Sequence, residues 1–361
     1  MHTVGFCVWL VQEHPELRTT LIHPIGDGQD AAYADTRLIH NLLYSCPNIG
    51  VPAILYVMRA SMGTIRVRVP WVSGKNVIVA SSHFLPDVLP VFLKGKRSKG
   101  VVRAVYIHHI IQDMPRAKSL SNSLADLQEK LCFALIKRRF DKVIVVNHAV
   151  AKRLQELGFR RQQVLESSNF VTITPPTVAQ PYSTRDTTII FCGRLVQQKG
   201  VDDFLKVCEF LQQYIADFRA VMIGVGPEME RLRGIIARKK LAVEMTGFLS
   251  ETEKFKHLER AKLFVFPSIE EGWGIAIAEA LAVGTPVLAY DLAVYREVFG
   301  TVLRHVPISK LDELTQACLK VLQRYQQEPA TFIRDQQRAI ASAQRFIRDT
   351  VAVNEYTFLM E

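Results

Sequence analysis

Several familiar signatures are missing from this sequence of 361 residues. No apolar run approaches the ~18 residues that span a bilayer, and no Lys or Arg precedes the short apolar start at residues 6–11, so neither a transmembrane helix nor a secretory signal is expected. The six cysteines lie in apolar surroundings without Cys-x-x-Cys spacing, which predicts reduced core residues. Zinc-finger spacing, RNP-like strands and aromatic-interleaved basic runs are also missing, so no nucleic-acid partner is expected. The expected location is the cytoplasm.

Acidic residues are scarce in the first half of the chain. Residues 1–180 hold 22 Lys+Arg against 12 Asp+Glu, and residues 181–361 hold 23 of each, so the net charge of +10 arises in the first half. Basic clusters lie at residues 94–99 and 137–139, and an apolar stretch at residues 84–93 precedes the first cluster. This pattern suits a peripheral protein on the inner, anionic face of a membrane, with apolar side chains in lipid and cations at headgroups. A solvated basic face over a buried helix is the alternative.

From residue 188 onward, short apolar runs alternate with helical patterns. The runs read TTIIFCG, FRAVMIGVG, VEMTGF, LFVFP and PVLAY. Such alternation predicts a parallel sheet covered by helices on both faces, and ligands of such sheets bind beyond the carboxyl ends of the strands. Four residues follow directly after expected strands and are therefore expected to converge on one cleft: Arg194, Gly226, Phe248 and Glu271.

Residues 266–290, FPSIEEGWGIAIAEALAVGTPVLAY, read as a buried strand, a glycine-bearing loop, a short helix and a second buried strand. A helix that begins near Ile275, after Gly274, presents free backbone N–H groups and the positive end of its dipole, and both attract phosphate. Glu271 precedes this helix and Glu279 lies about one turn into it. A ligand with a phosphate group could therefore touch both carboxylates.

This stretch resembles the retaining glycosyltransferases of family 4, whose donor site carries E-G-[FW]-G, a second Glu eight residues after the first, and a closing G-T-P-V. The matching residues are Glu271, Gly272, Trp273, Gly274, Glu279, Gly284, Thr285, Pro286 and Val287. The family also carries a strand that ends in G-R and is followed by K-G, and residues 188–200 read TIIFCGRLVQQKG. An Arg fork and a Lys ammonium beside a strand end suit a diphosphate.

The resemblance implies an α/β protein of the GT-B fold, with two Rossmann-like domains that face a central cleft. The expected parts are an acceptor-binding domain at residues 1–173, a linker at 174–187 (TPPTVAQPYSTRDT), a nucleotide-sugar donor domain at 188–335, and a C-terminal helix at 336–361 that crosses back to the first domain. A helical pattern from about residue 330 to 358 supports the last part.

The resemblance also implies a role for each motif residue. Arg194, Lys199 and the amides after Gly274 would bind the diphosphate, Glu279 the ribose hydroxyls, and Glu271 the donor-sugar hydroxyls. The expected nucleotide-sugar site comprises Gly193, Arg194, Lys199, Gly226, Phe248, Gly274, Ile275 and Glu279. The family needs no metal, and the sequence has no D-x-D triplet to hold one beside a diphosphate, so we expect neither a metal nor a cofactor. Glycosidase-like use of the two Glu residues is possible but would leave the phosphate elements unexplained.

In the first half, NVIVASS, VRAVYIHHI and KVIVVN read as strands between helical stretches. His108 and His109 end the second of these, and alternation sends the two side chains to opposite faces, so at most one of them faces the cleft. A His at this place resembles the active-site histidine of the family. His109 is therefore a candidate catalytic residue with Glu271, Arg194 and Lys199, although a strand-end His can also be purely structural.

One departure from the family concerns the start of the chain. The family opens with a strand and a Gly-rich loop, whereas residues 3–12 here have a helical pattern and residues 19–23 form the first strand pattern. We therefore expect a first domain without its first strand. Either the domain is rearranged, or the chain is incomplete and inactive.

The leading hypothesis is a retaining, metal-independent glycosyltransferase that moves a sugar from a nucleotide-diphosphate sugar to a hydroxyl of a lipid-linked or polysaccharide-precursor acceptor. The alternative is a truncated or noncatalytic homologue that binds a nucleotide or a partner without transfer. A sugar-nucleotide epimerase of similar architecture is a third possibility, which the family-4 form of the carboxylate unit disfavours.

Overall fold

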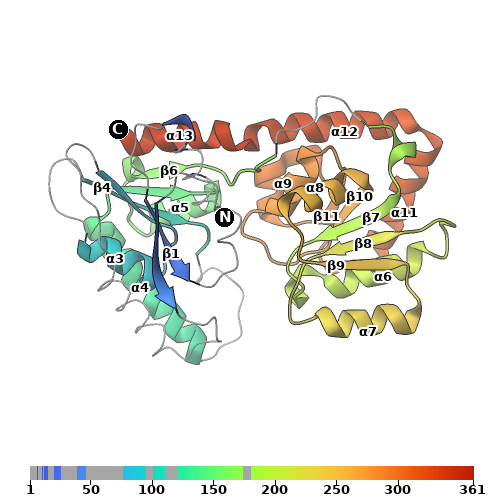
Figure 1. Cartoon of the computed structure of the whole chain (residues 1–361), viewed down its shortest axis with the longest axis horizontal. Coiled ribbons are helices and arrows are strands. Elements are labelled where there is room, and N and C mark those ends of the chain that lie inside the picture. The colour runs from blue at the N-terminus through green and yellow to red at the C-terminus, as the bar shows by residue number, and fades with distance from the viewer. Residues whose placement is uncertain are drawn as a thin grey trace. The chain divides into compact units, whose positions relative to one another are not determined.

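The computed structural model describes residues 6, 10, 12–14, 20–25, 39–45, 76–94, 101–110, 120–173 and 180–361 (Figure 1). Contacts divide the chain into two compact units. Unit 1 comprises Met1–Asn169 and Arg348–Glu361, and unit 2 comprises Phe170–Ile347. The boundary thus lies four residues before the expected linker. Residues 95–99 of the first basic cluster lie outside the described residues.

Unit 2 is built on a parallel sheet with the strand order β12-β11-β10-β7-β8-β9. Its strands are β7 (Thr187–Cys192), β8 (Ala220–Ile223), β9 (Val243–Gly247), β10 (Ala261–Phe266), β11 (Val287–Tyr290) and β12 (Arg304–Val306). The predicted α/β architecture is confirmed, and each predicted apolar run forms a strand. The short edge strand β12 was not predicted, because three residues carry too weak a pattern.

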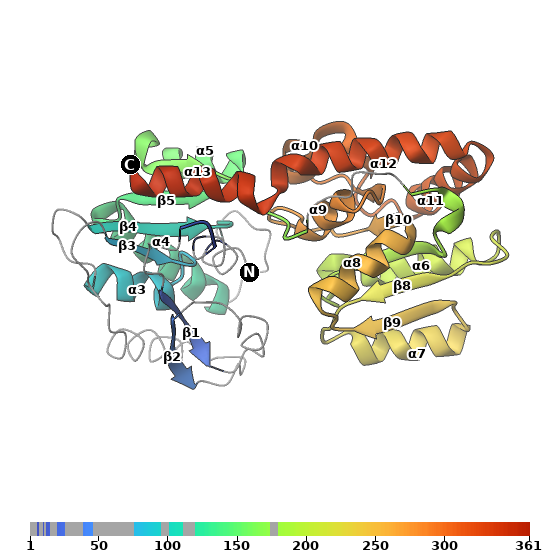
Figure 2. The ribbon, with the colours of Figure 1, turned by 45° about the horizontal axis from the view of Figure 1, so that its top comes forward.

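Helices cover both faces of this sheet, as Figure 2 shows. They are α6 (Val201–Leu211), α7 (Met229–Lys239), α8 (Glu251–Arg260), α9 (Ile275–Ala282), α10 (Ala293–Phe299), α11 (Leu311–Gln327) and α12 (Pro329–Ala343). Right-handed crossovers place α6 and α7 on one face and α9 on the other, because the strand order runs outward in opposite directions from the centre. Consistent with this, α11 packs on α6, whereas α8 and α12 pack on α9.

Unit 1 contains a parallel sheet with the order β3-β4-β5-β6. The elements are β3 (Asn76–Ala80), α3 (Leu85–Lys94), β4 (Val101–Ile107), α4 (Leu120–Arg139), β5 (Lys142–Val145), α5 (His148–Glu156) and β6 (Val164–Glu166). Alternate residues of β4 enter different cores: Val105 and Ile107 pack with α3 and α4, whereas Ala104 and Tyr106 pack with the C-terminal segment. The three strands predicted for this region are confirmed.

A separate pair of parallel strands, β1 (Thr20–Ile25) and β2 (Ile39–Ser45), precedes this sheet. The strand predicted at residues 19–23 corresponds to β1, and β2 was not predicted. Phe6, which is buried, and Leu10 are helical, in agreement with the helical pattern at residues 3–12, most of which lies outside the described residues.

The C-terminal segment is two helices rather than the single run expected from residue 330 to 358. Helix α12 ends at Ala343, a short 3₁₀ turn follows, and α13 (Arg348–Met360) belongs to unit 1. The break falls at Ile347, whose backbone is extended and forms a β-bridge with Val171. Backbone pairing there interrupts a helix that the side-chain pattern alone would continue.

A buried carboxylate fastens α13 into unit 1. Glu355 is fully buried and accepts hydrogen bonds from the hydroxyl of Tyr106 at 2.6 Å and from that of Ser167 at 2.7 Å. Both donors come from the sheet region, so the C-terminal helix is held by polar contacts as well as by the apolar packing of Ala352 and Leu359.

The apolar stretch at residues 84–93 forms α3, and most of it faces inward. Val88 and Val91 are buried in the core and Phe92 packs against it, whereas Leu93 is 53% exposed. The expectation that this stretch dips its apolar side chains into lipid is therefore wrong for Val88, Val91 and Phe92, which pack in the core of unit 1, and stays a prediction for Leu93. No helix in the described part of the chain is both long enough and apolar enough to cross a bilayer.

Candidate active site

The parallel strands of unit 2 bring the predicted residues to one edge of the sheet. Gly193 and Arg194 follow β7, Gly226 follows β8, Phe248 follows β9, and Glu271 lies in the loop after β10. Because all strands of this sheet run in the same direction, the loops at their carboxyl ends share one edge, where ligands of open α/β sheets bind.

Glycines let the loops after β7 and β8 pack backbone against backbone. A Cβ on Gly226 would lie 2.2 Å from the carbonyl oxygen of Leu195, and a Cβ on Gly224 would lie 1.9 Å from that of Gly193. The amide of Leu195 donates to the carbonyl of Val225 at 2.9 Å. Only glycine permits this approach, so the two loops form one continuous wall of the site.

The loop after β7 also reaches the loop after β10. The ammonium of Lys199 lies 2.6 Å from Oε1 of Glu271 and donates to the carbonyl of Glu270 at 2.9 Å. Both charged side chains are largely buried, with exposed fractions of 18% and 14%. The two residues, predicted from motifs more than seventy positions apart, are thus direct partners. Each neutralises the charge that the other could otherwise offer to a ligand.

Helix α9 begins at Ile275, as predicted. Gly274, at its N-cap, has φ 104°, a left-handed conformation that favours glycine, and a Cβ there would lie 3.1 Å from the rings of Tyr295 and Phe299. No side chain caps this helix, and Ile275 is 36% exposed. The amide of Ile277 donates to the carbonyl of Gly274 at 3.0 Å, so within the described residues the amides of Ile275 and Ala276 remain available to an acceptor group from a ligand.

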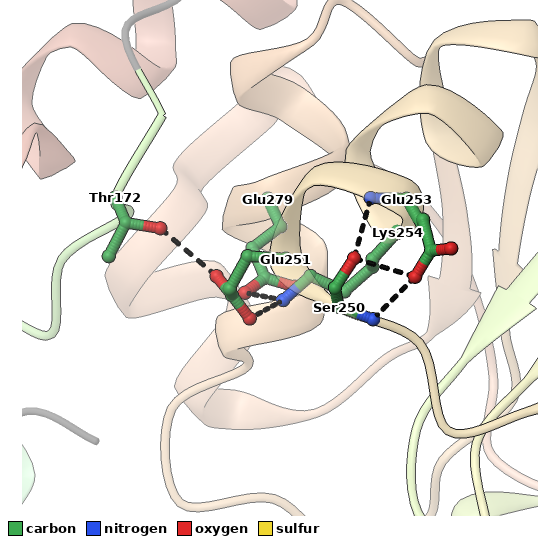
Figure 3. A network of polar contacts seen from close by, with 6 residues as sticks. All are labelled: Thr172, Ser250, Glu251, Glu253, Lys254 and Glu279. Carbon is green, nitrogen blue, oxygen red and sulfur yellow. Dashed lines mark hydrogen bonds and ion pairs between the residues drawn. The ribbon is translucent and has the colours of Figure 1, made fainter. Parts of the chain in front are cut away.

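Glu279 lies within α9 and is buried. Its Oε1 is 2.7 Å from the ammonium of Lys254 on α8, and the same ammonium lies 2.7 Å from Oε1 of Glu251 (Figure 3). Thr172 donates a hydrogen bond to Glu251 at 3.0 Å, and Ser250 caps α8 through a capping box with Glu253. The ammonium of Lys254 thus joins α8 to α9.

Burial dominates the electrostatics of this network. Burial raises the pKa of the Glu279 carboxyl to about 6, and the charge of Lys254 opposes that shift. Burial alone would lower the pKa of Lys254, but Glu279 and Glu251 raise it above its ordinary value. Burial and the charge of Glu279 raise the pKa of Cys192 to about 12.

Two further predicted residues are open to solvent. Within the described residues, no side chain forms an ion pair or hydrogen bond with the exposed guanidinium of Arg194. Phe248 is 79% exposed, although large aromatic rings are usually buried. An unpaired cation and an open ring at one sheet edge suit a phosphate and a base, respectively.

In unit 1, the two predicted histidines follow β4 and have different neighbours. Nε2 of His108 is 3.3 Å from the carbonyl oxygen of Ser81. The ring of His109 lies edge-on to the ring of His83, with 5.8 Å between centroids. Both predicted histidines are half-buried.

Sequence reasoning missed the residues behind His109. His83 follows β3 and is buried, and its Nε2 lies 2.9 Å from Oε1 of the fully buried Glu129 on α4. Asp87 accepts hydrogen bonds from Ser81 and Ser82, and burial raises the pKa of its carboxyl. The sequence did contain a signal for these residues, because the polar run Ser81, Ser82 and His83 directly follows the apolar strand β3. In unit 2, Lys254 was missed because a Lys three residues after a Glu on a helix is common on surfaces.

Cysteines and metal ligands add little to either unit. Cys132, Cys192, Cys208 and Cys318 are buried free thiols, as predicted, whereas Cys7 and Cys46 lie outside the described residues. No group of three His, Cys, Asp or Glu side chains suited to a metal ion occurs among the residues whose placement is described.

Comparison with known proteins agrees with this geometry. Residues 179–334 match the family model described as glycosyl transferases group 1. The Escherichia coli K12 protein named for colanic acid biosynthesis, WcaL, is 31% identical over 207 residues, covering 54% of this chain and 48% of its own length. A phosphatidyl-myo-inositol mannosyltransferase of Mycobacterium leprae is 25% identical, covering 50% and 49%. The chain thus spans about half the length of these curated relatives.

Solved structures extend the likeness to the whole chain. The crystal structure of HepE from Anabaena, in complex with UDP and glucose, has a TM-score of 0.72 at 16% identity and covers 99% of this chain and 95% of its own. A glycosyltransferase from Rickettsia africae has a TM-score of 0.71 at 15% identity, covering 99% and 93%. At such identities the likeness establishes the fold. Residues 179–334 are thus similar to the glycosyl transferases group 1, and the chain has the two-unit α/β fold of the GT-B glycosyltransferases.

Proposed function

We propose that this protein is a retaining, metal-independent glycosyltransferase of family 4. It would transfer a sugar from a nucleotide-diphosphate sugar to a hydroxyl of a lipid-linked or polysaccharide-precursor acceptor. The observation that carries the proposal is the partnership of Lys199 with Glu271 at 2.6 Å, beside the uncapped start of α9. A cation for phosphate and a carboxylate for sugar hydroxyls are already adjacent there.

The charge pattern supports binding of a diphosphate. Lys199 would exchange Glu271 for a phosphate oxygen, and Arg194, which has no partner among the described residues, would bind further oxygens. The free amides of α9 complete a set of donors that requires no metal ion. Glu271, released from Lys199, would accept hydrogen bonds from hydroxyls of the donor sugar.

Glu279 supports binding of the nucleoside. Its carboxylate is held by Lys254 at 2.7 Å and is ionised above about pH 6. It would accept hydrogen bonds from the ribose hydroxyls, which are strong when the acceptor is charged. Phe248, exposed at the end of β9, would border the base.

The proposed reaction breaks the bond between the anomeric carbon and a diphosphate oxygen and forms a bond from that carbon to the acceptor oxygen. The acceptor hydroxyl loses its proton to the departing diphosphate. Negative charge grows on that diphosphate in the transition state, so preorganised donors from Arg194, Lys199 and α9 would lower the barrier. His109 of unit 1 would contact the transferred sugar.

The relatives support the acceptor class. Among them are proteins named for colanic acid and O-antigen biosynthesis and one phosphatidyl-myo-inositol mannosyltransferase. The basic first half of the chain suits an anionic surface. We therefore propose peripheral association with the inner face of a membrane.

The test is a transfer assay with UDP-, GDP- and ADP-sugars and a lipid-linked saccharide acceptor, in the presence of EDTA. The expected result is release of one nucleoside diphosphate together with a glycosylated product that keeps the anomeric configuration of the donor. Lys199→Met should abolish this activity. Nucleotide binding without product would contradict transfer, and an inverted product would contradict the retaining assignment.

A further inference from the structure

Helix α4 (Leu120–Arg139) is apolar on two opposite faces. Its inner face carries Cys132, Phe133 and Ile136, which are buried in the core of unit 1. A helix at the surface of a sheet needs only one such face, because its other side meets water. A second apolar face therefore calls for a second apolar environment.

Three leucines form this outer face. Leu124, Leu127 and Leu131 are 45%, 65% and 51% exposed. Their spacing of three and four residues aligns them on one side of the helix, directly opposite Phe133 and Ile136, over a length of about 10 Å. Scattered exposed leucines are ordinary, but an aligned set marks an interaction surface.

The charges beside these leucines are all positive. Lys130 and Arg138 are exposed and form no ion pair or hydrogen bond within the part of the chain that the structure describes. The acidic residues of α4 are turned away, since Asp126 is only half-exposed and Glu129 is buried against His83. The α4 surface, defined as Leu124, Leu127, Leu131, Lys130 and Arg138, is therefore apolar and cationic.

The neighbouring end of α3 has the same character. Arg139 donates a hydrogen bond to the carbonyl of Phe92 at 2.7 Å, and its guanidinium lies 4.9 Å from the centre of the Phe92 ring. The next residue, Leu93, is 53% exposed. Leucine side chains with nearby cations thus extend from the middle of α4 to the point where the two helices end.

We propose that the α4 surface docks on an anionic lipid bilayer. Leucines would enter the headgroup boundary and the unpaired cations would meet lipid phosphates, as amphipathic interfacial helices do. A nucleic acid would use the cations but not the leucines, and a second copy of this chain, which shares the same cations, would repel this surface. The membrane contact proposed above is thereby assigned to α4. The assignment rests on the proposed function for the identity of the membrane, which is the inner face that carries the acceptor.

The test is flotation of the full chain with vesicles of equimolar phosphatidylglycerol and phosphatidylcholine, with pure phosphatidylcholine vesicles beside them. Leu124→Gln, Leu127→Gln and Leu131→Gln together should lower the partition coefficient at least about tenfold. Lys130→Gln with Arg138→Gln should lower it by about 30-fold on anionic vesicles and weaken its dependence on salt. The mutated side chains are exposed, so thermal unfolding should be unchanged.

Matched controls change side chains of the same kinds elsewhere. Tyr214→Gln with Ile308→Gln removes exposed apolar groups, and Lys256→Gln with Lys320→Gln removes exposed cations, all in unit 2. These variants should float like the original protein. Equal flotation of the α4 variants and the controls would overturn the proposal, as would a dimer that dissociates only in the leucine variant. Nucleotide affinity, measured on the same samples, reports separately on the proposed function.

Discussion

The ammonium of Lys254 lies 2.7 Å from the carboxylate of Glu279, and both side chains are about nine-tenths buried. The pair joins α8 to α9 and holds the carboxylate of Glu279 in place. A residue proposed to bind ribose is therefore built into the core of unit 2 rather than presented on a mobile side chain. Its position depends on a lysine that belongs to none of the sequence motifs.

Replacing Lys254 with Met should destabilise unit 2 by about 3–5 kcal/mol, because it leaves a buried carboxylate without its cation. Urea unfolding measures this change. The matched control is Lys206→Met, which removes a lysine that is 55% exposed and lies 3.3 Å from Asp203. It should cost less than about 1 kcal/mol. Equal losses for the two variants would contradict the structural role of Lys254.

The stability contributed by Glu279 should depend on pH. Its pKa is raised from 4.5 to about 6 by burial, so between these values the folded state binds a proton that the unfolded state has lost. The contribution is complete below pH 4.5 and is lost as pH rises through about 6, by about 2 kcal/mol. Glu279→Gln cannot titrate. The stability of the original protein relative to Glu279→Gln should therefore fall across this window, and a constant or rising difference would refute the assignment.

Two glycine substitutions should act in opposite directions. Gly226→Ala places a Cβ 2.2 Å from the carbonyl oxygen of Leu195, whereas Gly234, in the middle of α7, has open space around it. We expect Gly226→Ala to destabilise by more than about 2 kcal/mol, and Gly234→Ala to stabilise by up to about 1 kcal/mol. Differential scanning calorimetry compares them, and a neutral Gly226→Ala would mean that the loops after β7 and β8 do not pack as described.

Arg194→Ala should separate binding from stability. The side chain is exposed and has no partner within the described residues, so its loss should change stability by less than about 0.5 kcal/mol. The affinity of the variant protein for a nucleoside diphosphate should fall by about tenfold or more, since a charge-assisted hydrogen bond is lost. Arg238→Ala, which removes an exposed arginine of α7, is the control for charge. Equal affinities for the two variants would remove Arg194 from the site.

Sequence periodicity predicted the sheets well where strands are buried. Continuous apolar runs such as TTIIFCG are typical of a strand covered on both faces, and β7 is such a strand. The break at Ile347 was not predictable, because it depends on a backbone bridge to Val171, far away in the sequence. The sequence also could not show that the apolar valines of α3 are buried whereas the apolar leucines on the outer face of α4 are exposed, because both helices carry aliphatic side chains.

Motif spacing predicted which residues share the candidate site, but not their partners. The order of strands brought Lys199 to Glu271. The pairings of Glu279 with Lys254 and of His83 with Glu129 depend on helix packing across the fold, which leaves no mark on local sequence.

Isothermal titration calorimetry with UDP, GDP and ADP shows whether the carboxyl edge of unit 2 binds a nucleoside diphosphate. We expect the folded protein to bind at least one of them. We also expect Lys199→Met and Glu279→Gln each to weaken that binding at least about tenfold. A folded protein that binds none of the three, or variants that bind as tightly as the original, would contradict the proposed nucleotide site.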